Sequence, residues 1–212
     1  MSHGVHAVQH EVEHQIEHEN HGHGGGRDAR STESRNKKVA LLIAVIALFL
    51  SLSETLGKSA QTTALNYQID ASNLWNFFQA KNIRRTTTII AAEAMKIELA
   101  AVTDEARKAA LTKQIDTWTK TAARYRSEPD VREGTVELMQ RAREQEHLRD
   151  TALARYHHYE VASAAFQIGI VLASATVITG MVVLSFLAGG LGLIGLGFMA
   201  IGLFAPHAVH LF

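Results

Sequence analysis

The sequence predicts an all-α membrane protein with three transmembrane helices and a helical hairpin or bundle between the first and the second. Three observations lead to this fold class. An apolar run follows the pair Lys37-Lys38, and the 52 residues after Glu160 contain no Asp, Glu, Lys or Arg. The charged stretch between them contains few helix breakers, and only two prolines in 212 residues argue against an all-β chain.

The first transmembrane helix is predicted over Val39 to Gly57, within a segment 27–57 that also supplies a basic anchor. Its apolar run of about 18 residues is just long enough to cross a core of ~30 Å at ~1.5 Å per residue. A buried helix of a soluble domain is the competing interpretation. A secretory signal is disfavoured, because the run begins near residue 39 and lacks an A-x-A cleavage site.

The charge-free block 161–212 is too long for a single span and is predicted to contain the second and third transmembrane helices. Gly189-Gly190 is the expected turn. We therefore expect one helix over about 162–187 and another from about Leu191 to the C-terminus, with Pro206 in its last turns.

Small residues recur three or four positions apart on one face of the helix expected over 162–187. They are Ala165, Gly169, Ala173, Thr176 and Gly180. Lipid provides no hydrophobic driving force between helices, so small side chains favour association by letting backbones approach closely. The alternative is that Ala and Gly are simply common in membrane helices, but we interpret the strip as a packing face.

Basic residues close to the spans predict the orientation of the chain. The expected turn and the tail contain no basic residue. Five basic residues precede the first span: Arg27, Arg30, Arg35, Lys37 and Lys38. This distribution predicts a cytoplasmic N-terminus, with the region 58–160 on the other side. The inverted topology stays open, because Arg149 and Arg155 approach the second span.

The region 58–160 is predicted to be helical and outside the membrane. From Gly57 to Glu160 it has 16 Lys+Arg and 14 Asp+Glu in mixed order. Helix starts are expected at Thr103-Asp104-Glu105 and at Ser127-Glu128-Pro129-Asp130, the second leading directly into the second span. Five mostly apolar residues alternate steps of four and three, as in a heptad repeat, and predict helix–helix packing. They are Leu111, Ile115, Trp118, Ala122 and Tyr125.

The most aromatic stretch of the chain contains Leu74, Trp75, Phe77 and Phe78. Two interpretations are open. Buried aromatic residues dominate interfaces, so these side chains are candidates for contact with another subunit or partner. Alternatively, they fill the core of the small helical region itself.

Histidines are concentrated at the N-terminus, where segment 1–26 is predicted to form an amphipathic helix followed by a glycine linker. Imidazoles four residues apart can share an ion, and neutral imidazole suits Zn²⁺, Ni²⁺ or Cu²⁺. Three interpretations of this segment are open. It binds a metal ion; it is a solvated helix whose apolar side rests on the membrane or on a partner; or it is a surface that responds to pH. The candidate ligands are His3, His6, His10, His14, His18, His21 and His23.

The pattern A-S-x-x-W-x-x-[FY]-Q-A-K, from Ala71 to Lys81, stands between a basic-flanked span and a C-terminal pair of spans. In this order of elements the chain resembles a family of small bacterial membrane proteins, domain-of-unknown-function family 4337, over about residues 36 to 205. The resemblance implies a bacterial inner-membrane, multi-pass protein and brings no activity or catalytic residue. It also implies a basic turn between the last two spans, which Ala188-Gly189-Gly190 does not supply.

We therefore expect a homo-oligomeric structural, scaffold or accessory subunit in contact with the lipid bilayer and with a membrane-protein partner. A metal-ion-responsive channel or transporter using the N-terminal histidines is the alternative. The absence of Asp, Glu, Lys and Arg from the last two spans weakens this alternative, since charge within the membrane usually marks an ion path.

No enzyme is expected, because no nucleophile–base pair or HExxH motif occurs and Cys is absent. The balanced charge disfavours nucleic-acid binding.

Overall fold

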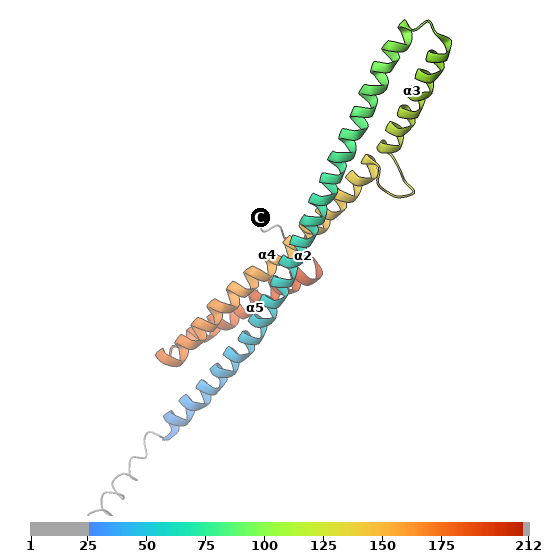
Figure 1. Cartoon of the computed structure of the whole chain (residues 1–212). Helices are drawn as coiled ribbons and strands as arrows, with labels where there is room; N and C mark the ends of the chain where they lie inside the picture. Colours follow the sequence, from blue (N-terminus) through green and yellow to red (C-terminus); the bar gives the residue numbers. More distant parts are fainter. Residues whose placement is uncertain (1–25, 210–212) are drawn as a thin grey trace, which may run out of the picture. The chain divides into compact units, whose positions relative to one another are not determined.

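The computed structural model describes the backbone of residues 26–209 and the side chains of residues 33–209. This part of the chain contains four α-helices and no strand (Figure 1). The helices are α2 (Gly26–Ala101), α3 (Glu105–Arg126), α4 (Thr135–Thr179) and α5 (Val182–Phe204). Of these, α2, α4 and α5 are long and apolar enough to cross a membrane. The predictions of an all-helical chain and of three helices of spanning length are thus confirmed.

The chain divides into two compact units. Of the described residues, unit 1 contains 26–52 and 162–197, and unit 2 contains 53–161 and 198–209. Helices α2, α4 and α5 each contribute to both units, whereas α3 belongs to unit 2 alone.

The interior of unit 1 is made by small and branched apolar side chains from three helices. Val39 of α2, Ala173 of α4 and Ala188 of α5 form a buried cluster. Beside it, the rings of Phe49 and Phe166 stack with centroids 6.2 Å apart. Most other apolar side chains of these segments point outward, because only a narrow stripe of each helix faces its neighbours.

The break between α4 and α5 lies at Gly180-Met181, so the expected turn at Gly189-Gly190 is wrong. Gly180 has a left-handed φ of +71°, a conformation that glycine adopts without strain. Its N–H donates to the carbonyl of Thr176 at 2.9 Å, and Thr179 Oγ1 accepts from Met181 N at 3.3 Å. These bonds satisfy backbone groups where α4 ends.

Gly189 and Gly190 lie inside α5, as do the four glycines that follow them in the sequence. Several of these four allow close packing. A Cβ at Gly192 would lie 3.5 Å from Ile46, and a Cβ at Gly195 would lie 2.7 Å from the ring of Phe166. Glycine can thus serve either a turn or a tight helix contact, and the sequence pattern did not distinguish the two.

Two further expected helix limits are wrong. Helix α5 ends at Phe204, so Pro206 lies beyond it rather than in its last turns. Ser127 is the C-cap of α3, not the start of a helix, and α4 begins only at Thr135. The expected start at Asp104 is confirmed, since its side chain accepts from Arg107 N at 2.9 Å.

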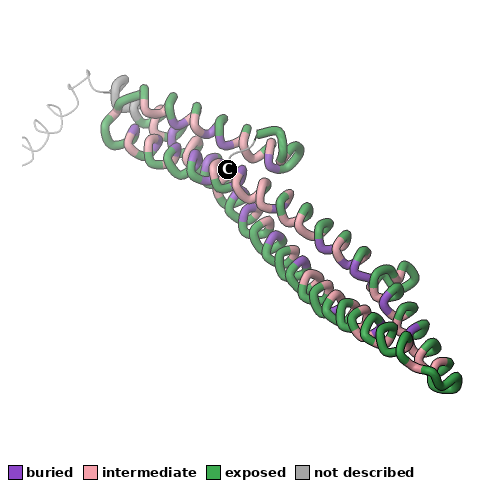
Figure 2. Tube along the Cα trace, turned by 90° about the horizontal axis from the view of Figure 1, so that it is seen from above, coloured by how far each residue is buried: buried purple, intermediate pink, exposed green. Residues whose placement is uncertain are grey.

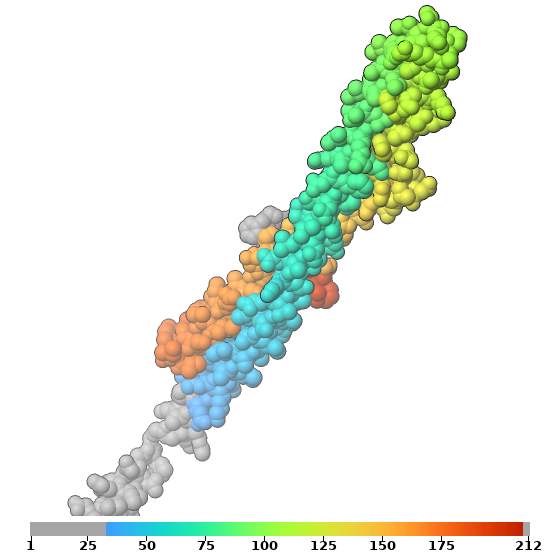
Figure 3. Space-filling view, viewed as in Figure 1, coloured from blue at the N-terminus to red at the C-terminus, as the bar shows by residue number. Residues whose placement is uncertain are grey.

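Unit 2 brings the last part of α2 beside α3 and the first part of α4, with α3 lying along α2 (Figure 3). The predicted seam of α3 forms its inward side, because Ile115 and Ala122 are buried and the other three members are half-buried. Closer to the apolar part of α2, Ser53 Oγ donates to the carbonyl of Tyr159 at 3.0 Å, and Ser53 is fully buried. Small residues again allow α2 and α4 to approach.

Replacement of Gly195 by alanine should destabilise unit 1. The new Cβ would lie 2.7–2.9 Å from three ring atoms of Phe166, a fully buried side chain. Overpacking of this kind costs ~1–3 kcal/mol. Gly197→Ala is the matched control, since a Cβ at that position would meet nothing within 4 Å and alanine favours helix. Thermal unfolding in mild detergent should show a lower Tm for Gly195→Ala only; equal effects would contradict a specific packing role for Gly195.

Candidate functional site

Four residues of the A-S-x-x-W-x-x-[FY]-Q-A-K pattern lie on one side of α2. Ala71, Trp75, Phe78 and Lys81 are spaced by four, three and three residues, which places them above one another on a helix. We call them the motif face. Ala71 and Lys81 are buried, and Trp75 and Phe78 are half-buried. The pattern therefore corresponds to a packed surface within unit 2.

Trp75 connects the motif face to α4. Its indole Nε1 donates to Glu146 Oε1 at 2.9 Å. The ring of Phe78 meets the indole edge to face, with centroids 5.4 Å apart and planes at 83°. A hydrogen bond to a carboxylate is stronger than a neutral one, so this contact fixes the register of α2 against α4.

Lys81 connects the same face to the loop between α3 and α4. Its side chain is 8% exposed, and Nζ lies 3.0 Å from Glu128 Oε2 and 3.8 Å from Glu133. The ammonium also lies 5.7 Å from the ring centroid of Phe77 and 6.0 Å from that of Tyr125. Two carboxylates and two aromatic faces thus compensate for the desolvation of one buried cation.

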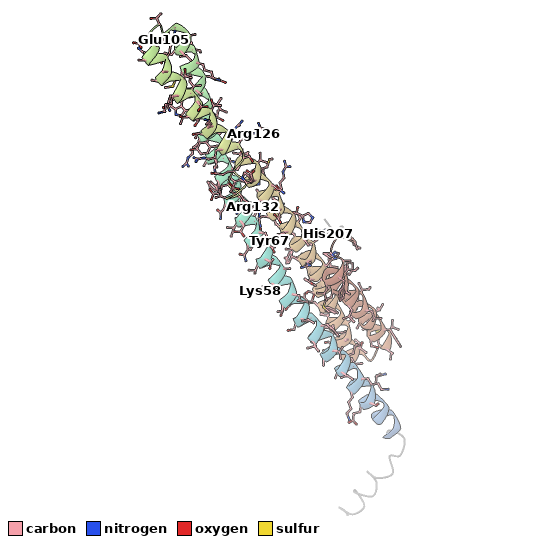
Figure 4. All side chains as sticks on the ribbon, turned by 90° about the vertical axis from the view of Figure 1, so that its right-hand side faces the viewer. Lys58, Tyr67, Glu105, Arg126, Arg132 and His207 are labelled. Atoms are coloured by element: carbon pink, nitrogen blue, oxygen red, sulfur yellow. The ribbon has the colours of Figure 1, made fainter. Side chains whose placement is uncertain are left out.

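The loop 127–134 is closed by Glu137 in the first turn of α4. Ser127 Oγ and the N–H of Glu128 donate to the two oxygens of its carboxylate, at 2.5 and 3.3 Å. The bond from Ser127 is the main cause that lowers the pKa of Glu137 below its ordinary value. Figure 4 labels Arg126 and Arg132, which belong to the end of α3 and to this loop.

The motif face and the loop hold three elements together. Two polar groups of the motif face meet other elements. Trp75 Nε1 donates to Glu146 of α4, and Lys81 Nζ donates to Glu128 of the loop. This arrangement can join α2, α3 and α4, and it supplies a structural reason for the pattern.

The predicted interaction residues fall into two sets. In the aromatic stretch, Leu74, Trp75 and Phe78 are half-buried within unit 2, whereas Phe77 is 39% exposed. In the small-residue strip, Ala165, Gly169 and Ala173 are buried within unit 1 and Gly180 is half-buried at the break. A Cβ at Gly169 would lie 3.3 Å from the carbonyl oxygen of Ala188. The strip thus contacts α5 of the same chain.

The seven candidate metal ligands, His3 to His23, lie outside the described residues. Among the described residues, no group of three or more His, Asp or Glu side chains is placed to hold a metal ion. The metal site therefore stays a prediction for the N-terminal segment.

Two other features of unit 2 involve polar side chains. A groove of about 220 Å³ lies between α2 and α4. Its volume is smaller than the ~300 Å³ at which ligand pockets usually begin. Arg149, which lines the groove, already forms hydrogen bonds with Gln68 and Asp150. His158, fully buried, has Nε2 3.0 Å from the carbonyl oxygen of Pro206 and stacks on Phe198. His207, labelled in Figure 4, lies 3.1 Å from Thr151. These contacts hold the segment after α5.

Sequence reasoning missed one surface. Ile69, Ile83, Ile90 and Ile97 lie on the exposed side of α2, at multiples of seven residues. The seven-residue spacing was the available signal. In the sequence this signal is weak, because Asn76 interrupts the row and charged residues stand beside it.

The pattern from Ala71 to Lys81 lies inside a match to a family model. The model of a domain of unknown function, DUF4337, matches residues 35–205. The chain belongs to the DUF4337 family. No curated protein and no solved structure matches it. The matched range takes in the motif face, most of α2 and all of α3, α4 and α5, so membership covers the helices of both units.

Replacement of Lys81 by methionine should destabilise unit 2. The substitution keeps the apolar stem but leaves Glu128 without its nearest cation, and hydrogen bonds to charged groups contribute ~1.5–3 kcal/mol. Lys96→Met, at an exposed position of the same helix, is the control. Chemical denaturation followed by Trp fluorescence should show a lower midpoint for Lys81→Met alone. A similar loss in both variants would mean that the pair contributes nothing specific.

The stability of the loop should depend on pH through Glu137. Because its pKa is lower in the folded chain, the carboxylate stabilises the fold above its ordinary pKa, and this contribution is lost as the pH falls through the lowered value. Glu137→Gln should therefore lower Tm near neutral pH, and this difference should shrink as the pH falls below the ordinary pKa of glutamate. Glu144→Gln, exposed on the same helix, should lack such a change; a pH-independent gap for Glu137→Gln would refute the linkage.

Proposed function

We propose that this chain is a multi-pass protein of the bacterial inner membrane that acts as a homo-oligomeric structural or accessory subunit, without enzymatic activity. The observation that carries the proposal is the distribution of apolar surface. Helices α2, α4 and α5 have spanning length, and outward-facing residues of unit 1 such as Leu48, Val171 and Phe186 are 66–77% exposed. Such side chains require lipid or protein around them.

The proposed membrane segments are the apolar parts of α2, α4 and α5. For α4 and α5 they fall in the block 161–212, with the connection at Gly180-Met181. A Cβ built at Gly180 lies 3.7 Å from the guanidinium of Arg35, so a basic side chain stands beside this connection. We place the N-terminus in the cytoplasm because Arg35, Lys37 and Lys38 lie together before the span.

The structural role is supported by what the motif face and the loop do. Their charged groups are engaged with one another, as in the pair of Lys81 and Glu128, and they join helices. Outside the apolar segments, unit 2 also exposes isoleucines on α2. Exposed apolar residues on an otherwise charged surface favour a protein partner, and another copy of the chain is the simplest one.

The alternative of a metal-ion-responsive channel draws no support from the described residues. Every histidine on which it depends precedes residue 26, outside the described part of the chain.

Native mass spectrometry of the chain released from membranes in mild detergent should give a discrete multiple of 23.2 kDa. This result is expected because exposed apolar surface outside the membrane segments is covered by association. An unrelated monomeric membrane protein in the same detergent is the control and should give its single-chain mass. A strictly monomeric chain at all detergent concentrations would overturn the homo-oligomeric role.

A further inference from the structure

The exposed side of α2 in unit 2 carries an apolar row with a strict seven-residue spacing. Ile69, Ile83, Ile90 and Ile97 are 57%, 66%, 61% and 77% exposed, and Asn76 occupies the one remaining place in the row. Exposed isoleucines at this regularity on one helix are unusual for a surface that only meets water, because each leaves a large apolar side chain hydrated.

A second row of small residues runs beside the first. Ala80, Thr87 and Ala94 are exposed and stand three positions before an isoleucine in each case. The alternation of three and four residues is the pattern of the contact positions of a coiled coil. The opposite side of α2 contains Ala71 and Lys81, both buried, and Figure 2 shows purple and green residues on different sides of this helix.

Lipid does not fit this surface. A helix with many charges is not stable in a hydrocarbon core, so the occupant of the row is a protein. The spacing further requires that this protein present a helix with the same repeat. Charged residues interrupt the same stretch of α2 every few positions, among them Arg84, Arg85, Glu93, Lys96 and Glu98.

We propose that the outer row of α2, from Ile69 to Ile97, binds the same row of a second copy of this chain, in parallel and in register. This inference rests on the proposed homo-oligomeric function and names its interface outside the apolar segments. Copies inserted in one membrane with the same topology point in the same direction, which makes the parallel pairing accessible. The row spans about four heptads, a length at which a repeated seven-residue pattern indicates a coiled coil.

Asn76 is the residue that favours a second copy over an unrelated helix. Its side chain is exposed and forms no hydrogen bond with the described residues. In a parallel, in-register pair each Asn76 amide meets its counterpart, so both are satisfied. Asn66 and Asn73 continue the second row three positions before Ile69 and Asn76, and they meet their counterparts in the same way. An asparagine in such a seam specifies register, because a pairing shifted by one heptad would bury Asn76 against isoleucine.

The charges beside the seam are compatible with this pairing. In a parallel pair, Glu93 of one copy approaches Glu98 of the other. Glu98 is already held by Arg107 of α3 at 2.5 Å, which reduces the repulsion. Arg84 approaches the neutral Gln79 of the other copy, so no like-charged pair forms at that level.

Single cysteines test the interface directly, because the chain contains no native cysteine. Ile90→Cys should form a disulfide-linked dimer under mild oxidation of the full-length chain in native membranes, since opposed residues of a seam lie within the ~4.4–6.8 Å Cα separation of a disulfide. Lys113→Cys, exposed on α3, is the control and should stay monomeric on a non-reducing gel. Equal cross-linking at both sites would overturn the inference.

A charge substitution gives an independent readout. Ile90→Glu should shift the native mass distribution towards monomer, with a dissociation constant raised on the order of tenfold or more, because a carboxylate would be buried in the seam. Thr117→Glu on the exposed side of α3 should leave the distribution unchanged. Circular dichroism of both variants checks that helix content is retained, which is expected because neither side chain is buried within the chain.

The outcomes separate the two proposals. If the chain is oligomeric but Ile90→Cys fails to cross-link and Ile90→Glu leaves the oligomer intact, the α2 interface is wrong while the homo-oligomeric function stands. If the unmodified chain is monomeric, both are wrong. Cross-linking at Ile90 together with dissociation by Ile90→Glu supports both.

Discussion

Helix α2 keeps its backbone hydrogen bonding unbroken over 76 residues, and the packing of the other helices has to follow its course. Along α2 the side chains change from mostly apolar to a mixture with many charged residues. In both parts, one side of the helix has to pack against neighbouring helices. Unit 1 meets this requirement with small residues and close backbone approach. Unit 2 meets it with aromatic rings, a buried cation and carboxylates, because these segments lie outside the apolar runs.

The two units use different interactions. In unit 1, the helices approach closely at glycine and alanine positions, such as Gly195 against Phe166. In unit 2, the polar pairs of the motif face decide register: Trp75 selects Glu146, and Lys81 selects the acidic loop. A helix joined by directional contacts has one favoured position, whereas apolar contacts alone permit several.

In this member of the DUF4337 family, the recognisable pattern packs helices of unit 2 against one another. Ala71, Trp75, Phe78 and Lys81 act on neighbouring elements, and the apolar row of α2 lies on the other side of the same helix. One side of this helix thus holds its own unit together, and the proposed pairing would use the other side. The proposed pairing and the proposed structural function would then rest on opposite sides of the same helix.

Composition and periodicity act locally, and they were enough to predict the helical class, three helices of spanning length, and the start and inward side of α3. The position of the break at Gly180 rather than at Gly189-Gly190 depends on contacts between helices, since a glycine can either adopt a positive φ or allow a neighbouring helix to approach. The role of Ser127 depends on such contacts too: it ends α3 and binds Glu137, although the same residue type can also start a helix. The partners of Trp75 and Lys81 lie 71 and 47 residues away in the chain, beyond the reach of any local pattern.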